Sequence, residues 1–255
     1  MLGTLTVNGT NLSTYGLYVT DAGVYNAPAP EVQAVSIDGR NGDLLISRDR
    51  YNNVEVRYPA FIASNFATNV RNLRSFLLSL VGYVRIEDSF DTDRFRIGRV
   101  VSGIDVQPSL YAEGGTFEIV FNCKPQRFFK SGEETITFLR EDGHQSERHP
   151  DHWIFGRVTN PGRGTALPQI KVYGSGTVQK VYVGGYTAFT ITTLEDYIIV
   201  DSDMQDAFKD GNINMNGYIN LPTTGVFPSF GVGGRDIAAT SGVTKIEIIP
   251  RWWTL

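Results

Sequence analysis

The stretch from Phe117 to Gly132, FEIVFNCKPQRFFKSG, decides how the chain divides. Every second residue from Phe117 to Cys123 is apolar, which predicts a half-buried strand. Pro125 lacks a backbone N–H and is expected to end the ladder of that strand. The polar segment that follows predicts a junction between two domains, with an ordinary loop inside one domain as the alternative. The predicted junction residues are Lys124, Pro125, Gln126, Arg127, Phe128 and Phe129.

Length and charge fit two domains, predicted at residues 1–130 and 131–255. The net charge of −4 and the pI near 5.4 argue against a basic surface that binds nucleic acid. Residues 1–130 hold 13 Lys/Arg and 13 Asp/Glu, and 11 of those cations are arginine. Because guanidinium groups pair carboxylates at interfaces, this half favours a protein-contacting surface, although scattered surface ion pairs would look the same.

The remaining compositional signals are negative. Cys123 is the one cysteine, which excludes an internal disulfide and a cysteine metal cluster, and its place on the apolar face predicts inert core. The first residues lack the cationic and apolar regions of a signal peptide. The longest nearly apolar run, Phe76 to Val84, is shorter than the roughly 20 residues that span a bilayer. We therefore expect a soluble protein, made in the cytoplasm, with no membrane partner.

The sequence predicts a mainly β protein whose N-terminal domain is α+β. An amphipathic helix is expected from Phe66 to Val81, because apolar residues recur there at three- and four-residue steps and Gly82 can end it. Pro59 places its strand at a sheet edge or a bulge. Strands are predicted at 1–8, Val32–Ile37, Val54–Ile62, Tyr83–Glu87, Phe95–Val106 and Phe117–Cys123.

The loop from Asp38 to Asp43, DGRNGD, is too polar for a core. It is either a flexible surface tip or part of an arm that becomes ordered on a partner. It lacks the lysine and the serine or threonine of a phosphate-binding loop.

The second half predicts a β-sandwich or jelly roll, since short strands with glycine turns recur along it. Gly184-Gly185 is expected to form a two-residue hairpin turn. Residues Glu141 to Leu167 are predicted to be an irregular loop. The predicted strands are Thr135–Leu139, Ile170–Tyr173, Val178–Val183, Thr187–Thr192, Tyr197–Val200, Tyr218–Leu221 and Val243–Ile249.

No catalytic, cofactor or metal site is predicted. The cluster of His144, His149 and His152 matches no zinc motif. Two acidic runs, at Asp88 to Asp93 and Asp201 to Asp206, lack the pattern of a calcium-binding hand, so turn chemistry explains them more simply. No nucleophile elbow is present, and sequence alone cannot place the two facing carboxylates that a glycoside hydrolase requires. Trp252 and Trp253 favour a C-terminal anchor over a sugar platform.

Several stretches together resemble the distal tail protein (Dit) family of siphophages that infect Gram-positive bacteria. These stretches cover nearly the whole chain in a matching order. They are NGTNLSTYGLYVTDAGVYNAP, VQAVSIDGRNGDLLI, NVRNLRSFLLS, GYVRIEDSFDTDRFRIGRVVSG, FNCKPQRFFKSG, IKVYGSG, IIVDSDMQDAFKDG and KIEIIPRWWTL.

The resemblance implies a structural protein at the distal end of the phage tail. The N-terminal domains would form a homohexameric ring, and the galectin-like C-terminal domains would project from it. The ring would join the tail tube protein to the tail-associated lysin-like hub protein, with a receptor-binding protein as a further partner, and DNA would pass through without specific binding. The subunit-interface residues implied are Ile37, Asp38, Gly39, Arg40, Asn41, Gly42, Asp43, Arg48 and Arg50. The alternatives are an adhesin that binds cell-wall saccharide and a glycoside hydrolase.

Overall fold

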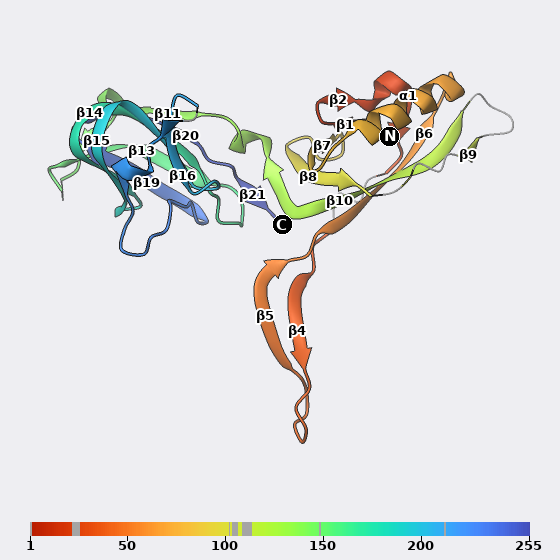
Figure 1. Cartoon of the computed structure of the whole chain (residues 1–255), viewed down its shortest axis with the longest axis horizontal. Coiled ribbons are helices and arrows are strands. Elements are labelled where there is room, and N and C mark those ends of the chain that lie inside the picture. Colours follow the sequence, from red (N-terminus) through yellow and green to blue (C-terminus); the bar gives the residue numbers. More distant parts are fainter. Residues whose placement is uncertain are drawn as a thin grey trace. The chain divides into compact units, whose positions relative to one another are not determined.

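The computed structural model describes residues 2–21, 26–101, 103, 107–108, 114–147, 149–211 and 213–255. Across these residues the chain is mainly β, as the sequence predicts, with one α-helix. It divides into two compact units, Met1–Phe128 with Leu255, and Phe129–Thr254 (Figure 1). No helix in the described ranges is long and apolar enough to cross a bilayer.

The N-terminal unit is built on one antiparallel sheet in the order β2-β1-β7-β8-β10-β6-β3, with β9 paired to β10. The helix α1 (Phe66–Ser79) and a 3-10 turn, η1 (Leu12–Tyr15), accompany it. A separate hairpin, β4 (Pro30–Val35) and β5 (Leu44–Tyr51), forms a two-stranded sheet of its own. The other strands are β1 (Leu5–Val7), β2 (Thr10–Asn11), β3 (Leu17–Val19), β6 (Val54–Ile62), β7 (Val84–Asp88), β8 (Arg94–Val100), β9 (Gln107–Pro108) and β10 (Gly115–Phe129).

The core of this unit lies on one face of the β6–β10 ladder. The two strands pair from Gly115 opposite Ile62 to Cys123 opposite Val54, and the residues predicted to face the core, Phe117, Ile119, Phe121 and Cys123, are buried. Val120, predicted to lie on the opposite face, is buried as well. Leu73 and Leu77 of α1 belong to the same core. Cys123 is fully buried, and that burial raises the pKa of its thiol to about 11, so the side chain stays protonated.

The helix ends earlier than its apolar pattern predicts. Its last helical residue is Ser79, and Leu80 is already extended, so Gly82 is not the residue that ends it. The Ser79 hydroxyl donates to the Phe76 carbonyl at 2.6 Å, a local bond that competes with the next helical turn. Val81, predicted to lie on the buried face, is consequently 90% exposed.

Two prolines behave differently from expectation. Pro125 does not end its strand, because β10 continues to Phe129. Pro125 lies beyond Cys123, the last residue of β10 that pairs with β6, so its missing N–H removes no hydrogen bond to β6. Pro59 is not on an edge strand, because β6 lies between β10 and β3. However, β3 pairs only with Ala60–Ile62, so Pro59 sits just past the end of that short ladder. Met1 of the first predicted strand and residues 102 and 104–106 of the strand predicted to reach Val106 lie outside the described residues.

The C-terminal unit is a second, larger antiparallel sheet. Its strands follow the order β12-β13-β19-β14-β15-β16-β17, with β20 joining β14 to β11 and β18 pairing with β15. Their bounds are β11 (Ile136–Leu139), β12 (His144–Gln145), β13 (His152–Asn160), β14 (Gln169–Val183), β15 (Tyr186–Asp201), β16 (Asp206–Lys209), β17 (Ile213–Asn214), β18 (Ile219–Asn220), β19 (Gly233–Thr240) and β20 (Val243–Ile249). The short strand β21 (Trp253–Thr254) pairs with β10 instead.

The long β14–β15 hairpin organises this sheet. Its predicted turn is confirmed, with φ of 60° at Gly184 and 86° at Gly185, conformations that glycine adopts without steric strain. Each of the two strands merges two shorter predicted strands. The prediction of a loop over Glu141–Leu167 is wrong, because that range contains β13. A bulge between Ile154 and Gly156 interrupts the alternation of β13 and hides its strand pattern.

An ion pair with a buried carboxylate fixes Arg251, four residues before the end of the chain, to the C-terminal unit. Asp201 is fully buried, and its two carboxylate oxygens accept hydrogen bonds from Arg251 at 2.7 Å each and one from Gln169 at 2.9 Å. Burial alone would raise the pKa of Asp201, but the hydrogen bonds from Arg251 and Gln169 outweigh it and lower the pKa overall. Trp252, next in the chain, is buried in the core, as expected of an anchor.

We predict that Arg251→Met destabilises the C-terminal unit by about 3 kcal/mol, because it leaves the buried Asp201 carboxylate without its cation. All three tryptophans lie in this unit, so fluorescence-monitored urea unfolding reports on it. The matched control is Arg157→Met, which breaks an exposed pair with Asp236 that contributes at most about 1 kcal/mol. Equal destabilisation by both variants would show that the Asp201–Arg251 pair stabilises the unit no more than an exposed ion pair does.

The same pair predicts a pH dependence. Since the pKa of Asp201 is lower in the folded chain, its contribution is complete above the unfolded value of about 4 and is lost as the pH falls through the folded value. The wild type should therefore lose more stability between pH 6 and pH 3 than Asp201→Asn does.

Candidate functional site

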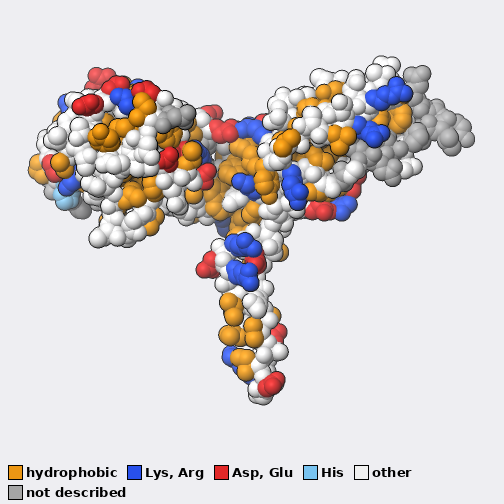
Figure 2. All heavy atoms as spheres, in the orientation of Figure 1, with side chains coloured by type: hydrophobic (Ala, Val, Ile, Leu, Met, Phe, Trp, Pro, Cys, Tyr) orange, Lys and Arg blue, Asp and Glu red, His pale blue; other side chains and the backbone are white. Residues whose placement is uncertain are grey.

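The hairpin β4–β5, with the loop at residues 36–43, is the candidate site and is called the arm below. Every residue of β5 is exposed, although Leu44, Leu45 and Ile46 are aliphatic. Figure 2 shows apolar side chains along this ribbon, with charged side chains where it meets the rest of its unit. An isolated two-stranded hairpin is marginally stable in water, so exposed aliphatic side chains on one indicate an interaction surface.

The register of the arm assigns its side chains to two faces. Directly opposed residues of an antiparallel pair point to the same side, and successive residues point to opposite sides. The Leu45 face holds Val32, Ala34, Leu45 and Ser47, and the Ile46 face holds Gln33, Val35, Leu44 and Ile46. The larger side chains are well exposed on both faces, with Leu45 at 68% and Ile46 at 46%.

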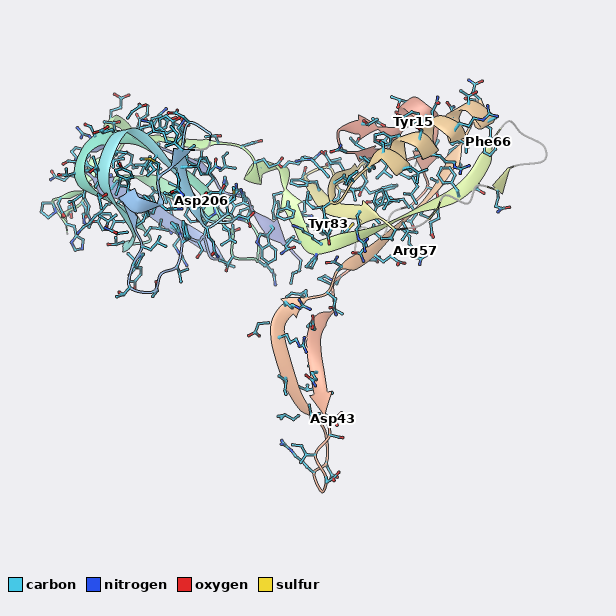
Figure 3. All side chains as sticks on the ribbon, in the orientation of Figure 1. Tyr15, Asp43, Arg57, Phe66, Tyr83 and Asp206 are labelled. Carbon is cyan, nitrogen blue, oxygen red and sulfur yellow. The ribbon has the colours of Figure 1, made fainter. Side chains whose placement is uncertain are left out.

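The predicted interface loop forms the tip of the arm. Residues Asp38–Asp43 are all exposed, and the N–H of Arg40 donates to the Ile37 carbonyl at 3.1 Å. Gly39 and Gly42 have φ of 78° and 84°, conformations in which a side chain would be strained. Figure 3 labels Asp43, where the tip leads into β5. The tip is thus a tight polar turn carried by an apolar ribbon.

Ion pairs link the two strands at the root of the arm, which is the end formed by Pro30 and Glu31 with Arg48–Tyr51. Glu31 accepts from Arg50 at 2.5 Å and pairs with Arg48 at 3.1 Å. The hydrogen bond from Arg50 is the main cause that lowers the pKa of the Glu31 carboxyl. The structure therefore brings Arg48 and Arg50 together on Glu31 of their own hairpin, away from the tip residues with which the sequence analysis grouped them.

Sequence reasoning missed the aliphatic part of the arm. A signal was available, since Leu44, Leu45 and Ile46 directly follow the polar loop and a short apolar run next to a turn is typical of a strand. What the pattern could not show is that these residues remain uncovered in the single chain.

Three exposed apolar residues of the N-terminal unit lie in the last turn of α1 and just after it. Leu78 is 81% exposed, Val81 is 90% exposed and Tyr83 is 48% exposed. The whole segment from Leu77 to Val84 carries no charge. Tyr83 is held in place by Asn53, whose amide donates to the phenol oxygen at 3.1 Å, and Figure 3 labels this tyrosine. These three residues are called the Val81 patch below.

The predicted junction residues make side-chain contacts or are partly buried. Arg127 forms an ion pair with Asp91, and the ring of Phe128 stacks on Phe95 with centroids 5.4 Å apart, both within the N-terminal unit. Phe129 packs on the core of the C-terminal unit. Lys124 lies 5.4 Å from the ring centroid of Tyr83, and Pro125 and Gln126 are half-buried. Phe128 and Phe129 thus contact different units.

Several of the residues considered for chemistry have structural partners. Asp88 accepts from the N–H groups of Phe90 and Asp91, the pattern of a polar turn. His149 stacks on His152, and the described residues contain no group of three or more His, Cys, Asp or Glu side chains placed to hold a metal ion. A hollow beside Asp91 and Arg127 measures about 10 Å³, which is space for about one water molecule.

One outer face of the C-terminal sheet carries tyrosines covered by lysines. Lys171 lies 3.9 Å from the ring centroid of Tyr197, and Lys245 lies 3.8 Å from that of Tyr173. The two phenols also contact carboxylates, Tyr173 bonding Glu247 and Tyr197 bonding Asp210. These contacts occupy ring faces on which a sugar would stack, so this surface gives an adhesin little support.

Comparison with known proteins identifies the fold. No family model matches the sequence, and no curated protein matches it significantly. The crystal structure of SPP1 Dit (gp 19.1), described as a paradigm of the hub adsorption apparatus in Gram-positive infecting phages, matches over 100% of both chains with a TM-score of 0.73 at 14% identity. The chain has the distal tail protein fold.

Two structures of the phage P2 baseplate, in its activated conformation with calcium and with strontium, are also similar to this chain. They match over 97% of both chains, with TM-scores of 0.52 and 0.50 at 10% identity. The resemblance to distal tail proteins drawn from the sequence is thus confirmed at the level of the fold.

The exposure of the arm predicts its response to protease. Trypsin should cut the dilute, unassembled chain first after Arg40, because Arg40 lies in a fully exposed turn whereas Arg48 and Arg50 lie in a ladder and bind Glu31. The order of cleavage is read by mass spectrometry of a time course, with Arg40→Gln as the control. Cleavage within the β6–β10 sheet before any cleavage in the arm would contradict this picture.

Proposed function

We propose that this chain is a structural subunit of a phage tail tip, located in the virion at the distal end of the tail. Copies close into a hexameric ring that joins the tail tube protein to the tail-associated lysin-like hub protein, with a receptor-binding protein as a further partner. DNA passes through the ring without specific binding, and the chain performs no catalysis. The observation that carries this proposal is an exposed apolar arm on a chain whose whole length has the distal tail protein fold.

The two units divide this work. Residues 1–130 are the ring-forming domain and residues 131–255 are a galectin-like domain that projects from it. The interface between subunits includes the tip, Ile37 to Asp43, and the charged root with Arg48 and Arg50. The Glu31 pairing supports a role for the two arginines in holding the arm's shape before a neighbour binds.

A closed ring needs two different complementary surfaces on each copy, since each interface is head-to-tail. The arm supplies one of them, and the Val81 patch supplies the other. Both surfaces expose aliphatic side chains and carry no charge along Val32–Ile37, Leu44–Ser47 and Leu77–Val84. Contact between them removes apolar area of both copies from water, which is the main driving force of association.

We predict that replacing Val32–Ser47 by a short Gly-Ser linker abolishes ring formation and leaves the rest of the chain folded. The arm forms its own sheet, so its removal takes no strand from either unit's main sheet. Native mass spectrometry and negative-stain images measure the oligomer, and circular dichroism on heating measures the fold. A variant that still forms rings with a central hole would show that the arm is not the closing element.

A mixing experiment tests the head-to-tail arrangement. Chains without the arm keep the Val81 patch, and Val81→Asp chains keep the arm, so neither should form rings alone. Mixed at high concentration, they retain one good interface and should form a one-to-one pair, which native mass identifies when the two chains differ in mass. Pairs formed by either variant alone would instead indicate a symmetric contact and contradict head-to-tail closure.

A further inference from the structure

We propose that Asn41, at the exposed tip of the arm, is a site of spontaneous deamidation that ages the unassembled chain. Its side chain converts to aspartate or isoaspartate without any enzyme, and the converted chain enters the ring less readily. The chemical step stands on the structure of the single chain alone, whereas its effect on assembly rests on the proposed function.

Asparagine followed by glycine is the dipeptide most prone to this reaction. The backbone nitrogen of the glycine attacks the side-chain Cγ of the asparagine, and the new N–C bond closes a five-membered imide ring. The side-chain nitrogen leaves as ammonia, with the proton that the backbone nitrogen loses. Water then adds to one of the two imide carbonyls and opens the ring, which gives aspartate or isoaspartate. Glycine favours the first step because it has no side chain to hinder the attack.

The chain contains three Asn-Gly pairs, which begin at Asn8, Asn41 and Asn216, and the structure separates them. The attack requires the asparagine to rotate until the glycine nitrogen meets Cγ, so hydrogen bonds that fix the asparagine slow it. The side chain of Asn216 is fixed at both of its ends. Its oxygen accepts from the N–H of Ala207 at 2.8 Å, and its nitrogen donates to the Asp206 carboxylate at 2.6 Å.

Asn8 is fixed through its backbone. With Gly9 it forms the two-residue turn between β1 and β2, whose pairing closes with Val7 opposite Thr10. Its N–H also donates to the carbonyl of Arg85 at 2.8 Å. Rotation at Asn8 would therefore break the ladder at this edge of the N-terminal sheet.

Asn41 has neither kind of restraint. It is exposed, and the strand pairing of the arm ends at Val35 opposite Leu44, so Asn41 and Gly42 belong to no ladder. Within the described part of the chain, neither the Asn41 side chain nor the Gly42 N–H makes a hydrogen bond. The attacking nitrogen and the attacked carbon can thus meet without breaking any described contact, next to the Asp43 that Figure 3 labels.

Conversion of Asn41 changes the tip in two ways. Asp38 and Asp43 against Arg40 give the tip a formal charge of −1, and the new carboxylate makes it −2. Isoaspartate also carries the main chain through the former side chain, which inserts a methylene group into the backbone just before β5. Because the tip is part of the proposed subunit interface, added charge and altered backbone both oppose the contact that an unconverted tip makes.

Peptide mapping of the purified chain, kept dilute at mildly alkaline pH, tests the chemical step. Samples taken over several weeks are digested at mildly acidic pH, where deamidation is slow, and analysed by mass spectrometry. Conversion at Asn41 should be at least about tenfold faster than at Asn216, where two side-chain hydrogen bonds must break first. Asn41→Gln should abolish conversion at this position, because glutamine must close a larger ring. Conversion at Asn8 or Asn216 as fast as at Asn41, or an unchanged Asn41, would overturn the proposal.

Analytical ultracentrifugation of fresh and aged chains tests the effect on assembly. Ageing should raise the concentration for half-assembly of the wild type at least about threefold, in step with conversion at Asn41, while circular dichroism on heating stays unchanged. Aged Asn41→Gln should assemble like the same variant when fresh. Converted wild type that assembles as well as fresh protein would overturn the effect on assembly. If fresh wild type forms no rings, the proposed function itself fails, and peptide mapping still decides the chemical step.

Discussion

A two-stranded ribbon cannot bury its own side chains, and this constraint governs the functional part of the molecule. Each residue of the arm has a cross-strand neighbour on its own face but no second layer to pack against. The two main sheets meet the same requirement internally, with fully buried residues such as Phe121 in one unit and Phe189 in the other. The aliphatic side chains of the arm remain exposed in the single chain, which is the reason we propose a partner outside it.

The ion pairs and hydrogen bonds at the root of the arm hold its strands in place before any association. Glu31 with Arg48 and Arg50 holds the two strands in register, and the Asn53 amide, which also contacts Asn122, ties the chain that follows the arm to the N-terminal sheet. Preorganisation reduces the conformational entropy that association must overcome. The ion pairs are exposed and add little stability of their own, so their contribution is to geometry.

The sequence alone predicts those strands and turns that local residue patterns determine. The alternation from Phe117 to Cys123, the β6 strand and the Gly184-Gly185 turn followed from local patterns that tertiary contacts left unchanged. The failures share a different cause. The early end of α1 depends on one serine hydroxyl, the strand through Pro125 depends on where its neighbour stops, and β13 was hidden by a bulge. Each is decided by a partner distant in sequence or by a single side-chain bond that periodicity does not encode.

The candidate site divides in the same way. The polar loop from Asp38 to Asp43 stands out in the sequence because glycine and charge are concentrated there, and in the structure it forms the tip of the arm. Its aliphatic ribbon looks, in the sequence, like any short buried strand. Burial is a property of the whole assembly, and a strand that is buried only after association has the sequence of a core strand and the exposure of a surface one. An exposed strand with the composition of a core is therefore evidence of a missing neighbour, and in this chain that evidence lies in Leu44, Leu45 and Ile46.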